Sequence, residues 1–368
     1  MPHLELLKLS KINSRKLWDD KLPGLSYMQN LRRLTIDKCC NIAYAFSFSV
    51  AREFVNLKYL AISNCQMLEE IFVSDGKFGS LPLSQNQFSN NEVVPNTSEL
   101  ILNSKDVTML CNGQLNDELI YTVTNLRLRC FHDESDKFPS DFLQRFVNLK
   151  KLKVTCSSFT YILNGSECDG HSETIMKLRI LVLVELDNLE FICEENSEVQ
   201  PILQNIETLS VHRCSRLKNI IQSSVLFENL EELLVVNCAG LENILKSSTA
   251  ISLQKLRKLY IDGCEKIEEI VASDDDNDTS ELVFMKLEYL WLKKLPSLRS
   301  FCKGRHGFKF PLLKSLFVID CPVMETFSHG VLDAAKLKKG VYPHVLDPRL
   351  IPNGTTQQSV YNHHDILV

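Results

Sequence analysis

The sequence predicts an α/β solenoid made of stacked repeats, and three observations support this prediction. Leucine is over-represented, at 56 of the 368 residues. The leucines recur in one template: an apolar residue, two variable residues, an apolar residue, one variable residue and a third apolar residue, often followed three positions later by cysteine. The copies start about 28 residues apart on average, a spacing found in chains whose repeats stack as coils.

The template gives each coil one short strand. An early copy reads Leu31-x-x-Leu34-x-Ile36-x-x-Cys39. Twelve copies begin at positions 4, 31, 57, 97, 123, 149, 178, 206, 230, 256, 287 and 313. Two apolar residues separated by one variable residue indicate a strand with one buried face. We therefore expect a leucine-rich-repeat horseshoe, with a parallel β-sheet on the concave face and short 3₁₀ or irregular helical segments on the convex face.

Two further apolar layers complete each coil. One lies three positions before the template, and it is phenylalanine in several copies, namely Phe54, Phe146, Phe227, Phe284 and Phe310. The other lies three and six positions after the cysteine, as in Leu241 and Ile244 after Cys238. Because no single coil buries its own apolar face, the coils are expected to stack.

Cysteine closes six copies, at Cys39, Cys65, Cys214, Cys238, Cys264 and Cys321. A metal or redox site is one interpretation of these residues. Free cysteine is among the most buried residue types and behaves as a small apolar residue. We therefore expect the six to be structural.

The repeats set the expected domain organisation. Residues 1–330 are predicted to form one leucine-rich-repeat domain of about 12 repeats, with an insertion near 74–91 that is rich in Ser, Gly, Asn and Gln. Residues 331–368 lose the repeat and are expected to form a C-terminal cap and a loose tail. No polar cap precedes Leu4, so we expect further residues or another domain to cover that edge.

Composition and motifs disfavour several function classes. The net charge of −5 gives no general attraction for nucleic acid. We expect no membrane span and a cytoplasmic location, because the sequence has neither a run of 18 apolar residues nor a signal peptide. The common nucleotide-binding, zinc-protease and serine-hydrolase motifs are not found, so we expect no enzymatic activity, no cofactor and no metal. The acidic run 274–278 does not fit a calcium loop, since Thr279 and Met285 replace its Gly and Glu.

The strand register also predicts a binding face. Positions 3, 5 and 7 of each copy alternate with the buried positions, so they face outward, onto the usual binding face of a solenoid. The last four copies place apolar and aromatic residues there, which we name the aromatic stripe: Leu234, Tyr260, Tyr289, Trp291 and Phe317. Such residues are typical of a protein interface. The alternative is that 331–368 folds back and covers them as a cap.

Two middle copies place basic residues on the same face. We name Arg127, Arg129, Lys151 and Lys153 the basic cluster; they occupy positions 5, 7, 3 and 5 of neighbouring copies. Such a surface attracts an acidic partner and speeds encounter. The alternative is an ordinary solvated sheet face, which is the commoner role of charged residues.

The repeats also resemble those of a known family. The segments that carry the resemblance are LKYLAISNCQMLEEIF (57–72), LEELLVVNCAGLENIL (230–245), LRKLYIDGCEKIEEIV (256–271), LEYLWLKKLPSLRSFC (287–302) and FPLLKSLFVIDCPVMETF (310–327). They resemble the C-terminal repeats of plant intracellular immune receptors, of the coiled-coil, nucleotide-binding, leucine-rich-repeat class. The resemblance implies a recognition domain that binds a pathogen effector or a guarded host protein. In a full receptor, the same repeats restrain the nucleotide-binding domain.

Two alternatives remain open. One is a stand-alone repeat adaptor, such as a substrate receptor of a ubiquitin ligase, although repeats of that kind continue differently after the cysteine. The other is a truncated remnant of a receptor, since neither a coiled-coil region nor a nucleotide-binding domain is found in this sequence.

Overall fold

The computed structural model divides into two compact units, which we describe separately. Unit 1 comprises Met1–Phe159 and Asn164–Val182, and unit 2 comprises Thr160–Leu163 and Leu183–Val368. The structure describes residues 4–18, 28–51, 53–65, 67–68, 70–73, 98–103, 117–132, 138, 143, 145–162, 177–193, 204–220, 227–275, 279–337 and 339–341. The predicted insertion at 74–91 and residues 342–368 lie outside this part of the chain.

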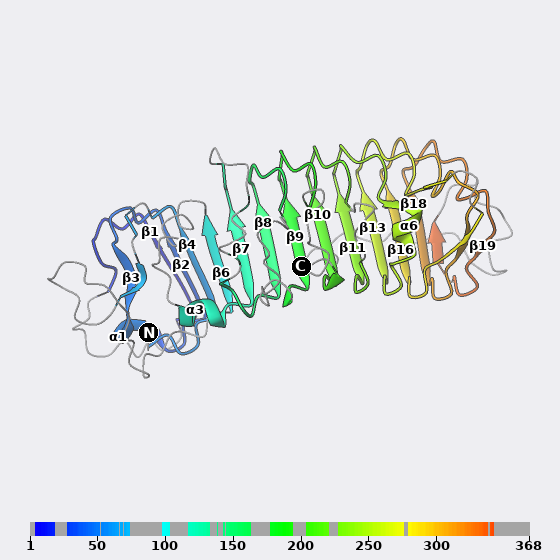
Figure 1. Ribbon diagram of the computed structural model, residues 1–368. Helices are drawn as coiled ribbons and strands as arrows, with labels where there is room; N and C mark the ends of the chain where they lie inside the picture. Colours follow the sequence, from blue (N-terminus) through cyan, green and yellow to red (C-terminus); the bar gives the residue numbers. More distant parts are fainter. Residues whose placement is uncertain are drawn as a thin grey trace. The chain divides into compact units, whose positions relative to one another are not determined.

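Unit 1 contains a parallel sheet with one strand from each coil (Figure 1). Its strands, in order, are β1 (Leu6–Ser10), β2 (Arg33–Asp37), β4 (Tyr59–Ser63), β6 (Glu99–Asn103), β7 (Asn125–Arg129) and β8 (Lys151–Thr155). Equivalent template positions pair across strands, for example Leu34 with Leu60 and Arg127 with Lys153. The predicted register is therefore confirmed. Other elements are β3 (Tyr44–Ser47), β5 (Glu70–Val73), α1 (Phe48–Ala51) and α3 (Asp117–Thr122).

Unit 2 repeats this arrangement. Its main sheet contains, in order, β10 (Thr208–His212), β11 (Glu232–Val236), β13 (Lys258–Asp262), β16 (Tyr289–Lys293), β18 (Ser315–Ile319) and β20 (Lys339–Val341). Strand β9 (Ile180–Val184) spans the division between the units. Shorter elements are β12 (Leu245–Lys246), α6 (Ser247–Ala250), β14 (Val271–Ala272), β15 (Glu281–Val283), β17 (Gly307–Lys309) and β19 (Leu332–Asp333).

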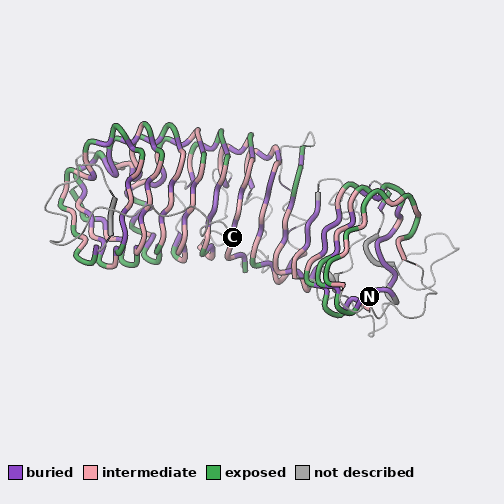
Figure 2. The backbone as a smooth tube through the Cα atoms, turned by 180° about the vertical axis from the view of Figure 1, so that it is seen from behind, coloured by how far each residue is buried: buried purple, intermediate pink, exposed green. Residues whose placement is uncertain are grey.

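The strands alternate between buried and outward-facing residues, as the template predicts. In β13, Leu259 and Ile261 are fully buried, whereas Lys258, Tyr260 and Asp262 are partly exposed. Figure 2 shows this alternation along the strands of both units, with most exposed residues in the turns at the strand ends. The phenylalanines predicted to precede each strand are buried as well.

The side opposite the main sheet contains short parallel strands besides the expected short helical segments. In the described residues, β3 pairs with β5, β12 with β14, and β17 with both β15 and β19, while α1 follows β3 and α6 follows β12. The backbone hydrogen bonds run between coils; for instance, the Leu245 N–H donates to the Ile270 carbonyl at 3.0 Å. A coil that bonds its neighbour in this way does not need an internal helix to satisfy its backbone. Isolated turns also occur, in which a backbone N–H donates a hydrogen bond to the carbonyl three residues earlier, as from Leu217 to Cys214.

The cysteines of the template are buried and free, which agrees with the structural interpretation. In each of the six, the Sγ–H lies within bonding distance of the carbonyl two residues earlier, at 3.4 Å from Cys65 to Ser63 and 3.7 Å from Cys264 to Asp262. The copy that starts at 149 has Ser157 at this position, and its hydroxyl makes the equivalent bond at 3.0 Å. Burial raises the pKa of the Cys321 thiol above its ordinary value, so it remains protonated.

The residue directly after each main-sheet strand from β1 to β18, wherever the structure describes it, has a left-handed backbone conformation. Ten of these residues are not glycine, with φ between 50° and 59°, and the eleventh is Gly263 at 68°. The ten are Lys11, Lys38, Asn64, Cys130, Cys156, Glu185, Arg213, Asn237, Lys294 and Asp320. The backbone N–H of most of them donates to the next coil, as from Lys294 to Ile319 at 2.9 Å. Bonds between stacked coils thus hold a conformation that side chains with a Cβ rarely adopt.

Substituting Lys294 with glycine is therefore expected to stabilise unit 2. A left-handed residue with a Cβ costs about 1–2 kcal/mol, and the greater entropy of glycine in the unfolded chain offsets part of this gain. The expected net gain is about 0.5–1 kcal/mol, measured as a higher urea midpoint. Lys294→Ala, which keeps a Cβ, is the control. An equal gain in both variants would show that the backbone conformation is not the cause.

The repeat geometry continues past residue 330. Leu337 is 6% exposed, and its N–H donates a hydrogen bond to the Ala334 carbonyl. Strand β20 pairs with β18. Residues 332–337 and 339–341 therefore add part of a further coil to unit 2. Because 342–368 lie outside the described residues, the division into a repeat domain and a C-terminal cap stays a prediction.

Candidate protein-interaction surface

The aromatic stripe lies on consecutive strands of unit 2. Leu234, Tyr260, Trp291 and Phe317 are register partners across β11, β13, β16 and β18. The Trp291 ring lies 5.8 Å from that of Phe317 and 5.4 Å from that of Tyr289, with interplanar angles of 5° and 7°. The Tyr260 ring is 6.1 Å from Trp291. All five side chains are partly exposed, so the stripe is a contiguous apolar surface on the outward face of the sheet.

The charged groups beside the stripe are paired with one another. The Lys258 ammonium lies 2.7 Å from the Glu232 carboxylate, and Lys293 lies 3.6 Å from Asp262. The Tyr260 hydroxyl donates to Asp262 at 2.9 Å, and burial together with this bond raises the pKa of the phenol. Since these charges are neutralised locally, the stripe is flanked by polar groups with little net charge.

A second row of charges runs along the edge of the same sheet, at position 2 of the last four copies. Arg257 bridges two carboxylates, at 3.9 Å from Glu231 and 3.1 Å from Glu288. Glu288 also accepts a bond from Lys314 on its other side. The row therefore alternates in sign from coil to coil, which ties neighbouring coils together.

This row predicts a pH-dependent contribution to stability. The Lys314 hydrogen bond holds the pKa of Glu288 below its ordinary value, with Arg257 acting the same way against the opposing effect of burial. A carboxyl whose pKa is lowered on folding stabilises the protein above the unfolded pKa, and this contribution is lost as pH falls through the folded pKa. Glu288→Gln is therefore expected to destabilise unit 2 at pH 7 and progressively less below about pH 4.5. Urea denaturation across pH measures this, with the exposed Glu325→Gln as control; a difference that does not shrink at low pH would contradict it.

The basic cluster lies on β7 and β8 of unit 1. Arg127 and Lys153 are register partners, and Lys151 is the partner of Asn125. The repeat template did not point to Glu99 of β6, whose Oε1 lies 2.9 Å from Arg127. Burial lowers the pKa of Lys153, and the charges of Arg127, Lys151 and Arg129 lower it further. Among the described residues, the cluster is thus a cationic surface with Glu99 as its one ion-paired carboxylate.

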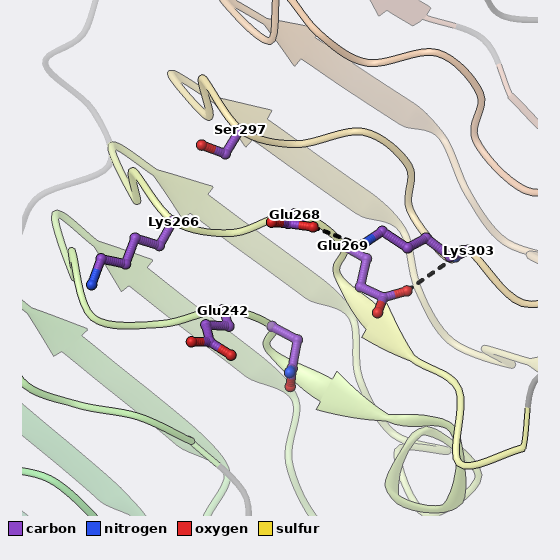
Figure 3. Close-up of a pocket in the computed structure, with 7 residues that line it drawn as sticks. Glu242, Lys266, Glu268, Glu269, Ser297 and Lys303 are labelled. Carbon is purple, nitrogen blue, oxygen red and sulfur yellow. Dashed lines mark hydrogen bonds and ion pairs between the residues drawn. The ribbon is translucent and has the colours of Figure 1, made fainter.

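A polar hollow of about 400 Å³ lies in the turns that follow β11, β13 and β16 (Figure 3). It is lined by Glu242, Asn243, Lys266, Glu268, Glu269, Ser297 and Lys303. The Lys303 ammonium lies 2.7 Å from Glu268, and the Lys303 backbone N–H donates to Glu269 at 3.0 Å. Lys303 thus binds both Glu268 and Glu269, and no described feature of the hollow points to a ligand, so we assign none to it.

Comparison with known families identifies the repeats. The family model described as plant disease resistance protein RPS2-like, leucine-rich repeats, matches residues 3–103, 96–228 and 224–334. Together the three matches cover most of the chain. The chain belongs to this family of plant disease resistance leucine-rich repeats. A protein-interaction role goes with the membership.

Solved structures outside this family are similar only at a low level. The leucine-rich repeat domain of the type III effector XopL is 16% identical with a TM-score of 0.38, over 60% of this chain and 77% of that one. An internalin from Listeria monocytogenes is 11% identical with a TM-score of 0.32, over 86% and 88% of the two chains. None of the curated proteins compared with the sequence matches it.

The described residues of this resistance-protein repeat region contain few candidate functional sites besides the outward face of the main sheet. No group of three or more His, Cys, Asp or Glu is placed to hold a metal ion in that part of the chain. The helices in the described residues lack the length and apolar character that spanning a lipid bilayer requires. The outward face of the main sheet therefore carries the strongest functional candidates that the structure describes.

Proposed function

We propose that this chain is the recognition region of a plant intracellular immune receptor of the coiled-coil, nucleotide-binding, leucine-rich-repeat class. It acts in the cytoplasm in plant defence and binds a pathogen effector or a guarded host protein. The observation that carries the proposal is the match of residues 3–334 to plant disease resistance repeats. The quoted segments, which resemble receptors of this class, support the same conclusion.

In this proposal the aromatic stripe is the main contact for the protein ligand. Its members lie on four consecutive strands with partly exposed side chains. Aromatic residues dominate the binding energy of protein interfaces, and the surrounding charges pair among themselves, as in an interface with an apolar centre and a polar rim. No cofactor and no chemical step are required.

The second partner in a full receptor is the nucleotide-binding domain, which the repeats restrain until ligand binds. This part of the proposal rests on the resemblance to the receptor class. It predicts that the chain, supplied as a separate polypeptide, lowers the activity of a coiled-coil and nucleotide-binding region from an RPS2-like receptor.

A co-expression experiment in leaves tests the proposal. The chain is expressed with such a nucleotide-binding region and, in turn, with a panel of secreted pathogen effectors; co-precipitation and cell death are measured. We expect restraint of cell death by the chain alone and its release by one effector or guarded host protein. Association with a ubiquitin-ligase scaffold, without any effect on the nucleotide-binding region, would instead favour a stand-alone adaptor. No association at all with a stably folded chain would favour a receptor remnant.

A further inference from the structure

The basic cluster differs from every other described part of the outward face in its charge balance. Four cationic side chains lie on two adjacent strands, and the register places Arg127 directly opposite Lys153. Like charges directly opposite one another on neighbouring strands are destabilising. Of the described carboxylates, Glu99 alone forms an ion pair with the cluster, through Arg127. Four positive charges thus meet one negative charge.

Unit 2 shows what the same template looks like when its charges are balanced. There Lys258 is paired with Glu232, and Lys293 with Asp262. In unit 1, no described acceptor forms an ion pair with Arg129, Lys151 or Lys153. Burial lowers the pKa of Lys153 most, and the charges of Arg127, Lys151 and Arg129 lower it further against the opposing charge of Glu99, which agrees with a net positive field at this face.

Glu99 shows which chemistry the cluster accepts. Its carboxylate reaches Arg127 from the neighbouring strand at 2.9 Å, and both side chains remain partly exposed. A carboxylate therefore fits between side chains of this face. Successive outward residues along a strand are about 6.6 Å apart, and alternate side chains of an extended peptide have the same spacing. An extended segment with acidic residues at every second position would match Lys151 and Lys153 along β8.

We propose that the basic cluster docks an acidic segment of the protein partner, in which two or more Asp or Glu side chains reach Arg129, Lys151 and Lys153. The proposal deepens the proposed function by naming the chemistry of a partner segment. Nucleic acid fits less well: only four cations are present and Arg127 is already paired with Glu99, fewer than the roughly 6–10 phosphate contacts of a protein that binds DNA strongly through its backbone.

The chain offers one competing occupant of its own. Asp133, Glu134 and Asp136 follow β7 in the sequence, outside the described residues. If these residues covered the cluster, neutralising them would expose it.

Peptide binding to the full chain tests the proposal. The probe is a fluorescent ten-residue peptide of alternating Glu and Ser, with a Gln–Ser peptide as its uncharged match. We expect measurable binding of the Glu–Ser peptide only, weakened by added salt and reduced about tenfold in Lys151→Gln/Lys153→Gln, because two exposed charge pairs contribute roughly this factor. Lys286→Gln/Lys294→Gln removes two exposed lysines from unit 2 and is expected to leave binding within about twofold.

Several outcomes would overturn the proposal. They are equal binding by the Glu–Ser and Gln–Ser peptides, no loss in the Lys151 and Lys153 variant, tighter binding of a single-stranded oligonucleotide, or binding that emerges only in Asp133→Asn/Glu134→Gln/Asp136→Asn. Thermal melts of each variant separate loss of binding from loss of folding. If the peptide fails to bind while an effector or guarded protein still binds through the aromatic stripe, this inference is wrong and the proposed function stands.

Discussion

Replacing Trp291 with aspartate is expected to weaken binding of the protein ligand by about 30-fold or more while leaving the repeats folded. Trp291 lies at the centre of the aromatic stripe, between Tyr260 on one neighbouring strand and Phe317 on the other. Central aromatic residues of an interface typically contribute 2 kcal/mol or more, and a carboxylate there would also have to lose its water. Titration calorimetry with the effector or guarded protein identified by co-expression measures the change.

The matched control is Met285→Asp. Met285 is 50% exposed in the same unit but lies in the turn before β16, away from the outward face of the strand. We expect the affinity of the Met285→Asp variant for the protein ligand to stay within about twofold of that of the unmodified chain, because substitutions outside an interface core are near neutral. If Trp291→Asp unfolds unit 2, the stripe is part of the core or is covered by a cap. If it folds and binds normally, the stripe is not the contact.

Phe301→Ala is expected to cause the largest loss of stability, about 3–5 kcal/mol. The ring is fully buried and stacks on Phe327 at 4.5 Å, with an interplanar angle of 9°. Phe308 and Phe310 pack edge-on against it at 5.3 and 6.1 Å. Alanine would remove these ring contacts and leave a cavity that the stacked coils on both sides prevent from closing. Urea denaturation of the full chain measures the loss.

The control is Phe301→Leu, which fills much of the cavity and is expected to cost clearly less than alanine. Since each coil contacts only its neighbours, amide hydrogen exchange should rise first in the coils around β15, β17 and β18. A loss below about 1 kcal/mol for Phe301→Ala would show that the aromatic column relaxes into the space.

Much of the fold was predictable because the repeat encodes it locally. The spacing of Leu256, Leu259 and Ile261 fixes which residues of one strand face inward, since neighbouring residues point to opposite faces. Repetition of the same spacing fixes the register between coils, as the pairing of Leu259 with Leu290 confirms. The layers that follow Cys238 and precede Leu287 were predictable on the same basis and are buried.

The opposite side of each coil was less predictable. Short stretches such as 245–246 and 271–272 carry no period long enough to distinguish a strand from a turn. The left-handed residues were not predicted either, because Lys, Glu, Arg and Cys occupy those positions as well as Asn, Asp and Gly. Their conformation depends on a hydrogen bond to the next coil, which the local sequence does not contain.

The repeat template alone was enough to predict which side chains share the outward face, including those of the aromatic stripe and the basic cluster. How the charges on that face are balanced became visible only in the folded coils: the stripe is flanked by ion pairs, whereas Glu99 is the single described carboxylate paired with the cluster. This difference comes from distance along the chain. Inward or outward direction is set within five residues, but each ion pair joins coils 26–31 residues apart and depends on where long, flexible side chains meet.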